Sequence, residues 1–219
     1  MAETAATGVR EIAKEARPVV EIFSTYMKNI SHDVLDAQNQ CVRKFLPAGW
    51  RFTQALTQVS HAECLQRCTQ MTDADVVMFL DIDCVPINSA ALPHLFQHAS
   101  AGKLVGAAQR ANHKNNGGHL YVGPFCMAFS RAKYFALGSP TFDETPRGDI
   151  GEELTYVWDE VVMLRPTSVT TSVWDLDAGQ MFGYGTTYQD MFYHEFCSRI
   201  TQHQTAFVNK CRNALQEKS

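Results

Sequence analysis

Five apolar residues that run directly into two aspartates constrain the fold more than any other feature. The apolar run is Val76–Leu80, and Asp81-Ile82-Asp83 follows it at once. Because the run is too short for an ordinary helix, it predicts a β-strand that is buried on both faces. Such strands are typical of α/β proteins, whose ligands bind beyond the carboxyl ends of the strands. The pattern therefore places Asp81 and Asp83 where a ligand would bind.

The two aspartates are expected to face different partners. Side chains two apart on a regular strand share a face, but Pro86 follows closely, so we expect the strand to be opening already at Asp83. One carboxylate can then face a divalent metal ion while the other faces a ribose. Carboxylate oxygens are the ligands that hard cations prefer. A single aspartate at a strand end can also simply cap a turn, and that alternative stays open for either residue taken alone.

Composition narrows the class of protein. A chain of 219 residues, 45% of them hydrophobic, can bury one substantial core, so we expect one main domain. A net charge of −4 gives no global attraction to polyanions, and nucleic acid is not the default partner. The seven cysteines are scattered and form no Cys-x-x-Cys pair, which favours reduced thiols in the cytoplasm. We expect no membrane span and no secretory signal.

A metal site of another kind is an alternative. His61, Cys64 and Cys68 fall on one face of a predicted helix, where they could form part of a zinc site if a distant fourth ligand existed. Cysteine is also a common small residue of protein cores, which is the structural alternative.

Strands and helices are expected to alternate along the chain. Residues 1–17 predict a helical extension, and 18–219 the main domain, in which Ser24–Asn29 forms a polar loop after the first strand. The expected elements are strand 19–23, a helix from 31 or 33 to 45, strand 50–56, helix 60–71, strand 76–80, helix 89–99 and strand 103–108. This alternation predicts an α/β fold with a mostly parallel central sheet flanked by helices, and 112–118 predicts a mobile loop.

Several segments, taken in order, resemble one enzyme family. They are 23–26, 79–83 with its Asp-x-Asp (DXD) motif, 123–131 and 151–154. Together they resemble the GT-A-fold glycosyltransferases, and the small family-2-like enzymes of viruses, phages or bacteria in particular. The resemblance spans residues 19–199 and implies a single Rossmann-like domain that transfers a sugar from a nucleotide-sugar donor. The chain departs from the family after the second strand, where Thr53, Gln54 and Thr57 replace a frequent Asp-Asp-Gly-Ser run.

The resemblance implies how the nucleotide-sugar donor is held, with a UDP-sugar favoured. Ser24, Thr25 and Tyr26 would hold the base and ribose, and Asp81 would reach the ribose or a metal-bound water. Arg199 would reach a phosphate.

The resemblance also implies a metal ion, Mn²⁺ or Mg²⁺. Asp83 is the expected direct ligand, with Asp81 beside it and His194 as a third ligand. From local sequence alone, a histidine among aromatic residues is more often part of a core. A divalent cation would neutralise the negative charge that develops on a nucleoside diphosphate leaving group.

An acidic cluster points to catalysis. Asp149, Glu152 and Glu153 crowd a predicted helix start, where helix capping could account for one of them. Three acids so close together suggest an acceptor site in which one carboxylate removes a hydroxyl proton as general base. Glu153 is the first choice and Asp149 the second. With such a base an inverting displacement is the natural mechanism, whereas a retaining enzyme of the same fold would place these acids differently, and the sequence leaves both mechanisms open. Later in the chain, the glycine-rich segment 182–188 predicts either a flexible lid or an ordinary loop.

Other functions remain open on the sequence alone. Asp81 to Val85 also fits the Asp-x-Asp-x-[Thr/Val] pattern of haloacid-dehalogenase-like phosphatases, although that motif normally ends the first strand. Sugar-phosphate nucleotidyl transfer and a non-catalytic nucleotide-sugar-binding module are further alternatives. The acceptor is expected to be a hydroxyl-bearing molecule, a saccharide first and a modified DNA base second. The expected compartment is the cytoplasm, or the host cytoplasm if the chain is viral.

Overall fold

The structure, a computed structural model, describes residues 17–111, 117–175 and 181–216. The predicted N-terminal extension therefore lies outside the described residues except for Arg17, and so does most of the predicted loop 112–118. The boundary between residues 17 and 18 stays a prediction.

Strands and helices alternate through the first half of the described chain, as predicted. The strands are β1 (Val20–Tyr26), β2 (Arg51–Leu56), β3 (Val76–Leu80), β4 (Cys84–Pro86), β5 (Leu104–Arg110), β6 (Leu120–Ser130), β7 (Val161–Leu164), β8 (Pro166–Asp175), β9 (Met181–Tyr188) and β10 (Phe192–His194). The helices are α1 (His32–Phe45), α2 (His61–Met71), α3 (Ala91–Ser100), α4 (Arg131–Ala136), α5 (Glu152–Val157) and α6 (Thr201–Gln216). Ser31 and Ser60 accept the capping hydrogen bonds that begin α1 and α2.

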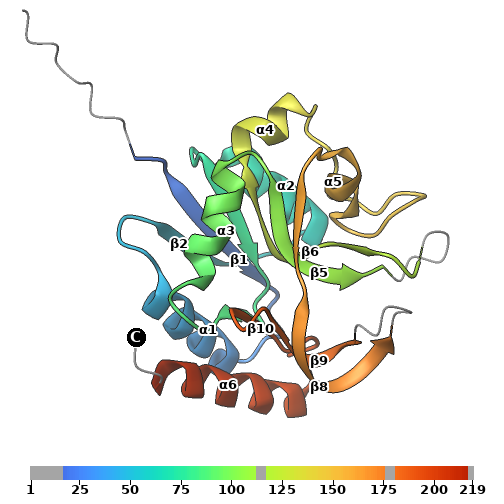
Figure 1. Cartoon of the computed structure of the whole chain (residues 1–219). Helices are drawn as coiled ribbons and strands as arrows, with labels where there is room; N and C mark the ends of the chain where they lie inside the picture. The colour runs from blue at the N-terminus through green and yellow to red at the C-terminus, as the bar shows by residue number, and fades with distance from the viewer. Residues whose placement is uncertain (1–16, 112–116, 176–180, 217–219) are drawn as a thin grey trace, which may run out of the picture.

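The central sheet has the strand order β2-β1-β3-β6-β5-β7 (Figure 1). Neighbouring strands run parallel except where β6 pairs with β3 and β5, to which it is antiparallel. β6 can run antiparallel because it follows β5 without a crossover helix, whereas a parallel connection needs a helix or an equally long link. The prediction of an α/β fold with a mostly parallel sheet flanked by helices is confirmed.

β3 lies in the middle of this sheet and is buried along its whole length. Val76, Met78 and Leu80 pack into the core that α1 and α3 share with the sheet. Val77 and Phe79 pack into the opposite core, which α2, α4 and α5 cover. The unbroken apolar run thus follows from a strand with helices on both faces.

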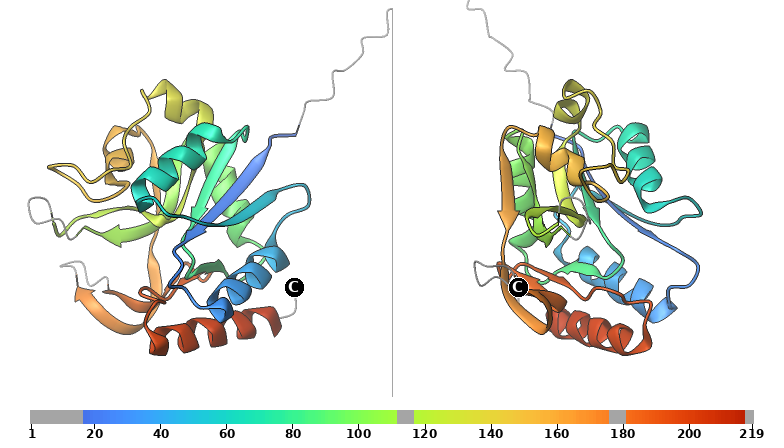
Figure 2. Two further views of the ribbon diagram at one scale, coloured as in Figure 1. Left: turned by 180° about the vertical axis from the view of Figure 1, so that it is seen from behind. Right: turned by 90° about the vertical axis from the view of Figure 1, so that its right-hand side faces the viewer.

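A second sheet, β4-β10-β9-β8, brings distant parts of the chain together. β10 runs antiparallel to β4, and the pairing places His194 opposite Cys84. α6 lies along α1 on the outside of the molecule (Figures 1 and 2), with Phe207 and Cys211 buried against Val34 and Cys41. β10 and the segment that follows it thereby lie against the acidic turn that follows β3.

Two sequence predictions about local structure are wrong. The first strand continues through Ser24 to Tyr26, because the Ser24 hydroxyl finds a buried partner and the ladder with β2 extends to Leu56. The glycine-rich 182–188 belongs to β9 rather than to a lid or loop. A Cβ atom on Gly183 would come within 2.0 Å of the Thr171 carbonyl oxygen, so this glycine allows β8 and β9 to approach.

Within the described residues, every helix is too short or too polar to cross a lipid bilayer.

Candidate functional site

The acidic pair lies on a tight turn at the carboxyl end of β3. The Cys84 amide donates to the Asp81 carbonyl at 2.9 Å, and the Asp81 amide donates to the Phe125 carbonyl on β6 at 2.8 Å. The strand therefore opens between Asp81 and Asp83, as predicted, and their side chains no longer follow a regular strand. Asp83 is 7% exposed, whereas the Asp81 side chain is about one third exposed.

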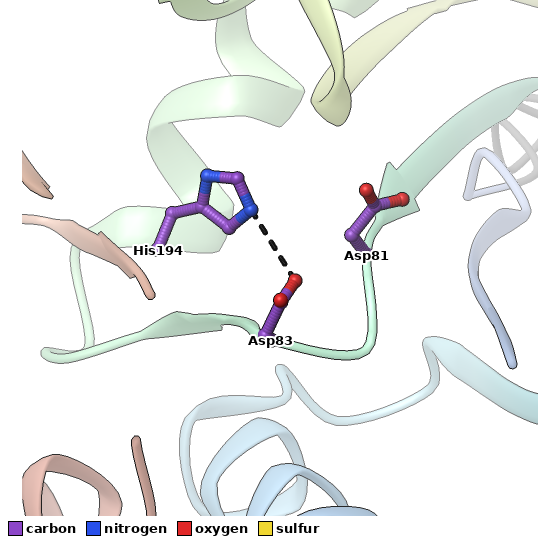
Figure 3. A group of neighbouring side chains, drawn as sticks. All are labelled: Asp81, Asp83 and His194. Atoms are coloured by element: carbon purple, nitrogen blue, oxygen red, sulfur yellow. Dashed lines mark ion pairs between the residues drawn. The ribbon is translucent and has the colours of Figure 1, made fainter. Parts of the chain in front are cut away.

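β10 delivers His194 to this turn. The register with β4 places the His194 ring beside Asp83, with Nε2 at 3.2 Å from Oδ1 (Figure 3). The ring stacks on Phe125, with the ring centroids 4.1 Å apart. One ligand atom from each of Asp81, Asp83 and His194 lies within 4.8 Å of the others. Residues more than one hundred positions apart in the sequence thus form one cluster, which sequence spacing alone does not reveal.

The charge state of the cluster follows from its contacts. Burial alone raises the pKa of Asp83, but the His194 imidazole and the Ser198 amide, which donates to Oδ2 at 3.1 Å, lower the pKa below its usual value. Burial lowers the pKa of His61, but its ion pair with Asp81, at 3.2 Å, raises that pKa by more. Asp83 is therefore held as a carboxylate, the form that binds a cation.

His61 is a member of the site that sequence reasoning missed. It opens α2, and its Nε2 faces Asp81 rather than the thiols of Cys64 and Cys68. Among the described residues, Asp81, Asp83 and His194 form the one group of three such side chains spaced for a metal, so the alternative zinc face gains no support. The sequence did contain one signal for this role: His61 stands at the start of a predicted helix, near the end of the strand that Asp81 follows.

Gln38 on α1 is a second residue that the sequence did not reveal. Its side-chain Nε2 donates to the carbonyl oxygens of Asp81 and Cys84, at 2.6 and 3.2 Å. Its Oε1 accepts from the Ser24 hydroxyl and from Gln54 Nε2, each at 2.8 Å. This amide is fully buried and ties the ends of β1 and β2 to the acidic turn.

The cluster lies in the wall of a cavity of about 500 Å³, a volume within the range of ligand pockets. Of the residues predicted to bind the nucleotide, Thr25, Tyr26 and Arg199 line this cavity. Ser24 is fully buried behind it and bonds to Gln38. The cavity thus collects residues from β1, the acidic turn and the segment after β10.

Among the predicted catalytic acids, Asp149 lines the cavity, as does Glu144. Glu153 instead forms an ion pair with Arg147 and accepts a hydrogen bond from the Thr145 hydroxyl at 2.7 Å. The hydrogen bond from Arg147 is the main reason that the pKa of Glu153 lies below its usual value. Glu153, in the first turn of α5, is therefore bound to residues of the loop that precedes this helix.

Glu152 has no exposed surface, and its carboxylate binds the residues around it. Its Oε1 contacts His119 and accepts from the Tyr156 hydroxyl at 2.6 Å, and its Oε2 accepts from the Asp149 amide at 2.8 Å. Glu152 thus holds the loop that carries Asp149. The catalytic roles of these three acids stay predictions, but their surroundings differ clearly.

The residues of the cluster fit a divalent cation. Two carboxylates and an imidazole are a mixed oxygen and nitrogen donor set of the kind that binds divalent metal ions. His194 Nδ1 is buried, and no hydrogen-bond partner for it lies among the described residues. The ring is therefore positioned by stacking and by Asp83.

Comparisons with known proteins give only distant likenesses. The sequence matches no protein-family model and no curated protein. Similar solved structures include a protein from STIV, at 10% identity over 75% of this chain and 93% of that chain, with a TM-score of 0.40. Others are the glycosyltransferase GlyE of Streptococcus pneumoniae (12% identity, 68% and 45% coverage, TM-score 0.38) and the 4-diphosphocytidyl-2C-methyl-D-erythritolsynthase of Anaerococcus prevotii (12%, 67% and 86%, TM-score 0.40). At these TM-scores the likenesses carry no argument about function.

Proposed function

We propose that this protein is a metal-dependent glycosyltransferase that moves a sugar from a nucleotide-sugar donor, with a UDP-sugar favoured, to a hydroxyl group of an acceptor. The observation that carries this proposal is the meeting of Asp81, Asp83 and His194 in the wall of one cavity. Such a cluster at the carboxyl end of a central strand combines a cation site with space for the rest of a nucleotide.

The proposed metal ligands are Asp83 and His194, with Asp81 as a third ligand or as the partner of the ribose. When bound, the cation would neutralise the charge that develops on the diphosphate leaving group. Mg²⁺ prefers oxygen ligands, so the imidazole makes Mn²⁺ the better fit.

The donor nucleotide would lie between the end of β1 and the segment after β10. Thr25 and Tyr26 are proposed to contact the base and ribose, because both line the cavity beside the acidic turn. Ser24 is buried behind the cavity wall, so we propose that it supports this site indirectly, through its hydrogen bond to Gln38. Arg199 lies on the same cavity wall, where its guanidinium suits a phosphate group.

The acceptor would be activated by Asp149, which we now place before Glu153 as general base. Asp149 lines the cavity, and Glu153 is not among the described residues that line it. In this proposal the Asp149 carboxylate takes the proton of the acceptor hydroxyl as the oxygen attacks the anomeric carbon, and the bond from that carbon to the nucleoside diphosphate breaks so that the nucleoside diphosphate leaves. That step corresponds to an inverting displacement. A saccharide is the favoured acceptor, a modified DNA base is the second candidate, and the cytoplasm stays the expected compartment.

A donor screen tests the proposal. UDP-, GDP- and dTDP-sugars are incubated with the protein with and without Mn²⁺, and thermal stability and release of nucleoside diphosphate are followed. A donor that binds the folded protein alone must raise its apparent stability. We expect a Mn²⁺-dependent response to at least one donor, UDP-sugars first. A stable adduct of beryllium fluoride on Asp81, with no response to any donor, would instead support the phosphatase.

A further inference from the structure

A buried contact between a carboxylate and an imidazole lies beside the candidate metal site and has no part in the proposed chemistry. Glu195 and His203 are 3% and 8% exposed, and His203 Nδ1 lies 2.8 Å from Glu195 Oε1. The Tyr193 hydroxyl donates to the other carboxylate oxygen, Oε2. Burying a carboxylate costs several kcal/mol unless its oxygens are paired. Both oxygens of Glu195 are paired, so the network is complete.

Glu195 begins a strained turn. Phe196 and Cys197, which follow it, both have a φ of 61°, in the left-handed region that residues other than glycine rarely adopt. Such conformations cost about 1 to 3 kcal/mol each and persist only where the surroundings impose them. The Glu195 backbone is fixed on both sides, because its amide donates to the Asp83 carbonyl at 3.1 Å and its carbonyl accepts from Gly185 at 3.3 Å.

The turn controls how Asp83 is held. His194, immediately before Glu195, contacts Asp83 Oδ1 at 3.2 Å. The Ser198 amide, at the far side of the turn, donates to Asp83 Oδ2 at 3.1 Å. The two carboxylate oxygens of Asp83 thus contact groups on either side of Glu195, one at the end of β10 and one within the turn, and Figure 3 shows His194 beside Asp83.

α6 supplies the other end of the network. His203 belongs to the first turn of α6, and its amide donates to the Ile200 carbonyl at 3.0 Å. Its ring packs against Tyr184, with the centroids 4.3 Å apart. The imidazole is therefore fixed by both its helix and β9.

We propose that Glu195 is a positioning residue which, together with His203 and Tyr193, holds the 195–198 turn so that His194 and the Ser198 amide present Asp83 to a cation. The inference rests on the proposed metal site but concerns residues that touch neither metal nor donor. Carboxylates that orient metal ligands from behind are typically worth about 10- to 100-fold in metal affinity.

The test compares Glu195→Gln with the parent protein by two measurements. The first is the dissociation constant for Mn²⁺, measured by titration calorimetry well below the melting temperature of each protein. The second is amide hydrogen exchange of segment 195–200 without metal. We expect the Mn²⁺ dissociation constant to rise about 10- to 100-fold and exchange at Ser198 to accelerate at least about tenfold. Tyr193→Phe, which removes one hydroxyl, should shift both in the same direction by less.

His98→Gln on α3 is the matched control for His203→Gln, since it makes the same replacement far from the turn in sequence and on another helix. His203→Gln should reproduce the effects of Glu195→Gln, and His98→Gln should produce neither. Unchanged Mn²⁺ affinity in Glu195→Gln beside a parent that binds Mn²⁺ would overturn the inference. A parent protein that binds no Mn²⁺ would overturn the proposed function, whereas faster Ser198 exchange in Glu195→Gln would still support the role of Glu195 in holding the turn.

Discussion

The two acidic regions near the cavity hold their carboxylates in different ways. At the turn after β3, the buried Asp83 carboxylate is held by a main-chain group, the Ser198 amide, and by the His194 side chain that β10 brings to it. At the start of α5, a side chain holds the carboxylate of Glu153: it is bound by Arg147, whose own side chain is 58% exposed. Asp83 is therefore held in one geometry away from solvent, whereas the partly exposed pair of Arg147 and Glu153 can rearrange at low cost.

The comparison teaches that an acidic residue near a cavity need not face it. Glu152, with no exposed surface, is bound by His119, Tyr156 and the Asp149 amide. Glu153 is bound by Arg147. Asp149 lines the cavity, and its loop is fixed by the other two acids. The following predictions test this division, beginning with the largest expected effect.

Asp83→Asn should abolish Mn²⁺ binding, because the amide removes the buried charge while keeping the size of the side chain. Titration calorimetry measures the binding, and circular dichroism confirms that the variant is folded. Asp73→Asn is the control, since it changes an aspartate that is 78% exposed and bound to Arg51. Full Mn²⁺ affinity in Asp83→Asn would remove the basis of the metal site.

Asp149→Asn should lower the rate of sugar transfer about 10²- to 10⁴-fold while leaving donor affinity unchanged, as expected for loss of a general base. Glu153→Gln should change the rate only slightly. Transfer is measured with the donor and acceptor that the screen identifies. The reverse order of the two variants would restore Glu153 as the base, and equal parental rates would make the whole loop structural.

Glu152→Gln should lower the free energy of unfolding by about 1 to 3 kcal/mol, because the amide cannot accept all the hydrogen bonds that the buried carboxylate accepts. Chemical denaturation measures this change. Glu160→Gln, which alters a side chain that is 63% exposed, should leave the stability close to that of the parent. A fully stable Glu152→Gln would mean that the loop does not depend on this carboxylate.

The Arg147 to Glu153 pair should give the smallest effect, visible as a dependence of stability on pH. The hydrogen bond from Arg147 lowers the pKa of Glu153 in the folded protein. The pair therefore stabilises the fold fully above the unfolded pKa of about 4.3, and this contribution is lost as the pH falls through the folded value. Denaturation of Arg147→Gln across that range should show a weaker loss of stability on acidification than the parent shows. Identical slopes would contradict the assignment.

The sequence predicted the parts of the fold that depend on local patterns. The buried strand before Asp81, the capped helices that begin after Ser31 and Ser60, and the mostly parallel sheet all follow from short stretches of chain. β9 was mistaken for a lid or loop because its glycines serve close packing against Thr171, which no local pattern reveals.

The site was only partly predictable for a related reason. The Asp-x-Asp motif indicates where a ligand would bind. His194 reaches that position only through the pairing of β10 with β4, which is a contact between distant segments. Asp149 lines the cavity and Glu153 does not, a difference that depends on how the loop before α5 folds. The sequence places His61 on a helix face with two cysteines. Its contact with Asp81 depends on how α2 lies against β3, which the sequence alone does not show.

The buried amide of Gln38 has a consequence for how sequences like this one can diverge. Its two N–H groups and its carbonyl oxygen make four hydrogen bonds, to Asp81, Cys84, Ser24 and Gln54. A carboxylate would repel the two carbonyl oxygens, and an apolar side chain would remove all four of these hydrogen bonds. Distant relatives that retain the acidic turn should therefore retain glutamine at this position of their first helix. This one residue would be a better guide to common descent than the aspartates that chemistry alone can select.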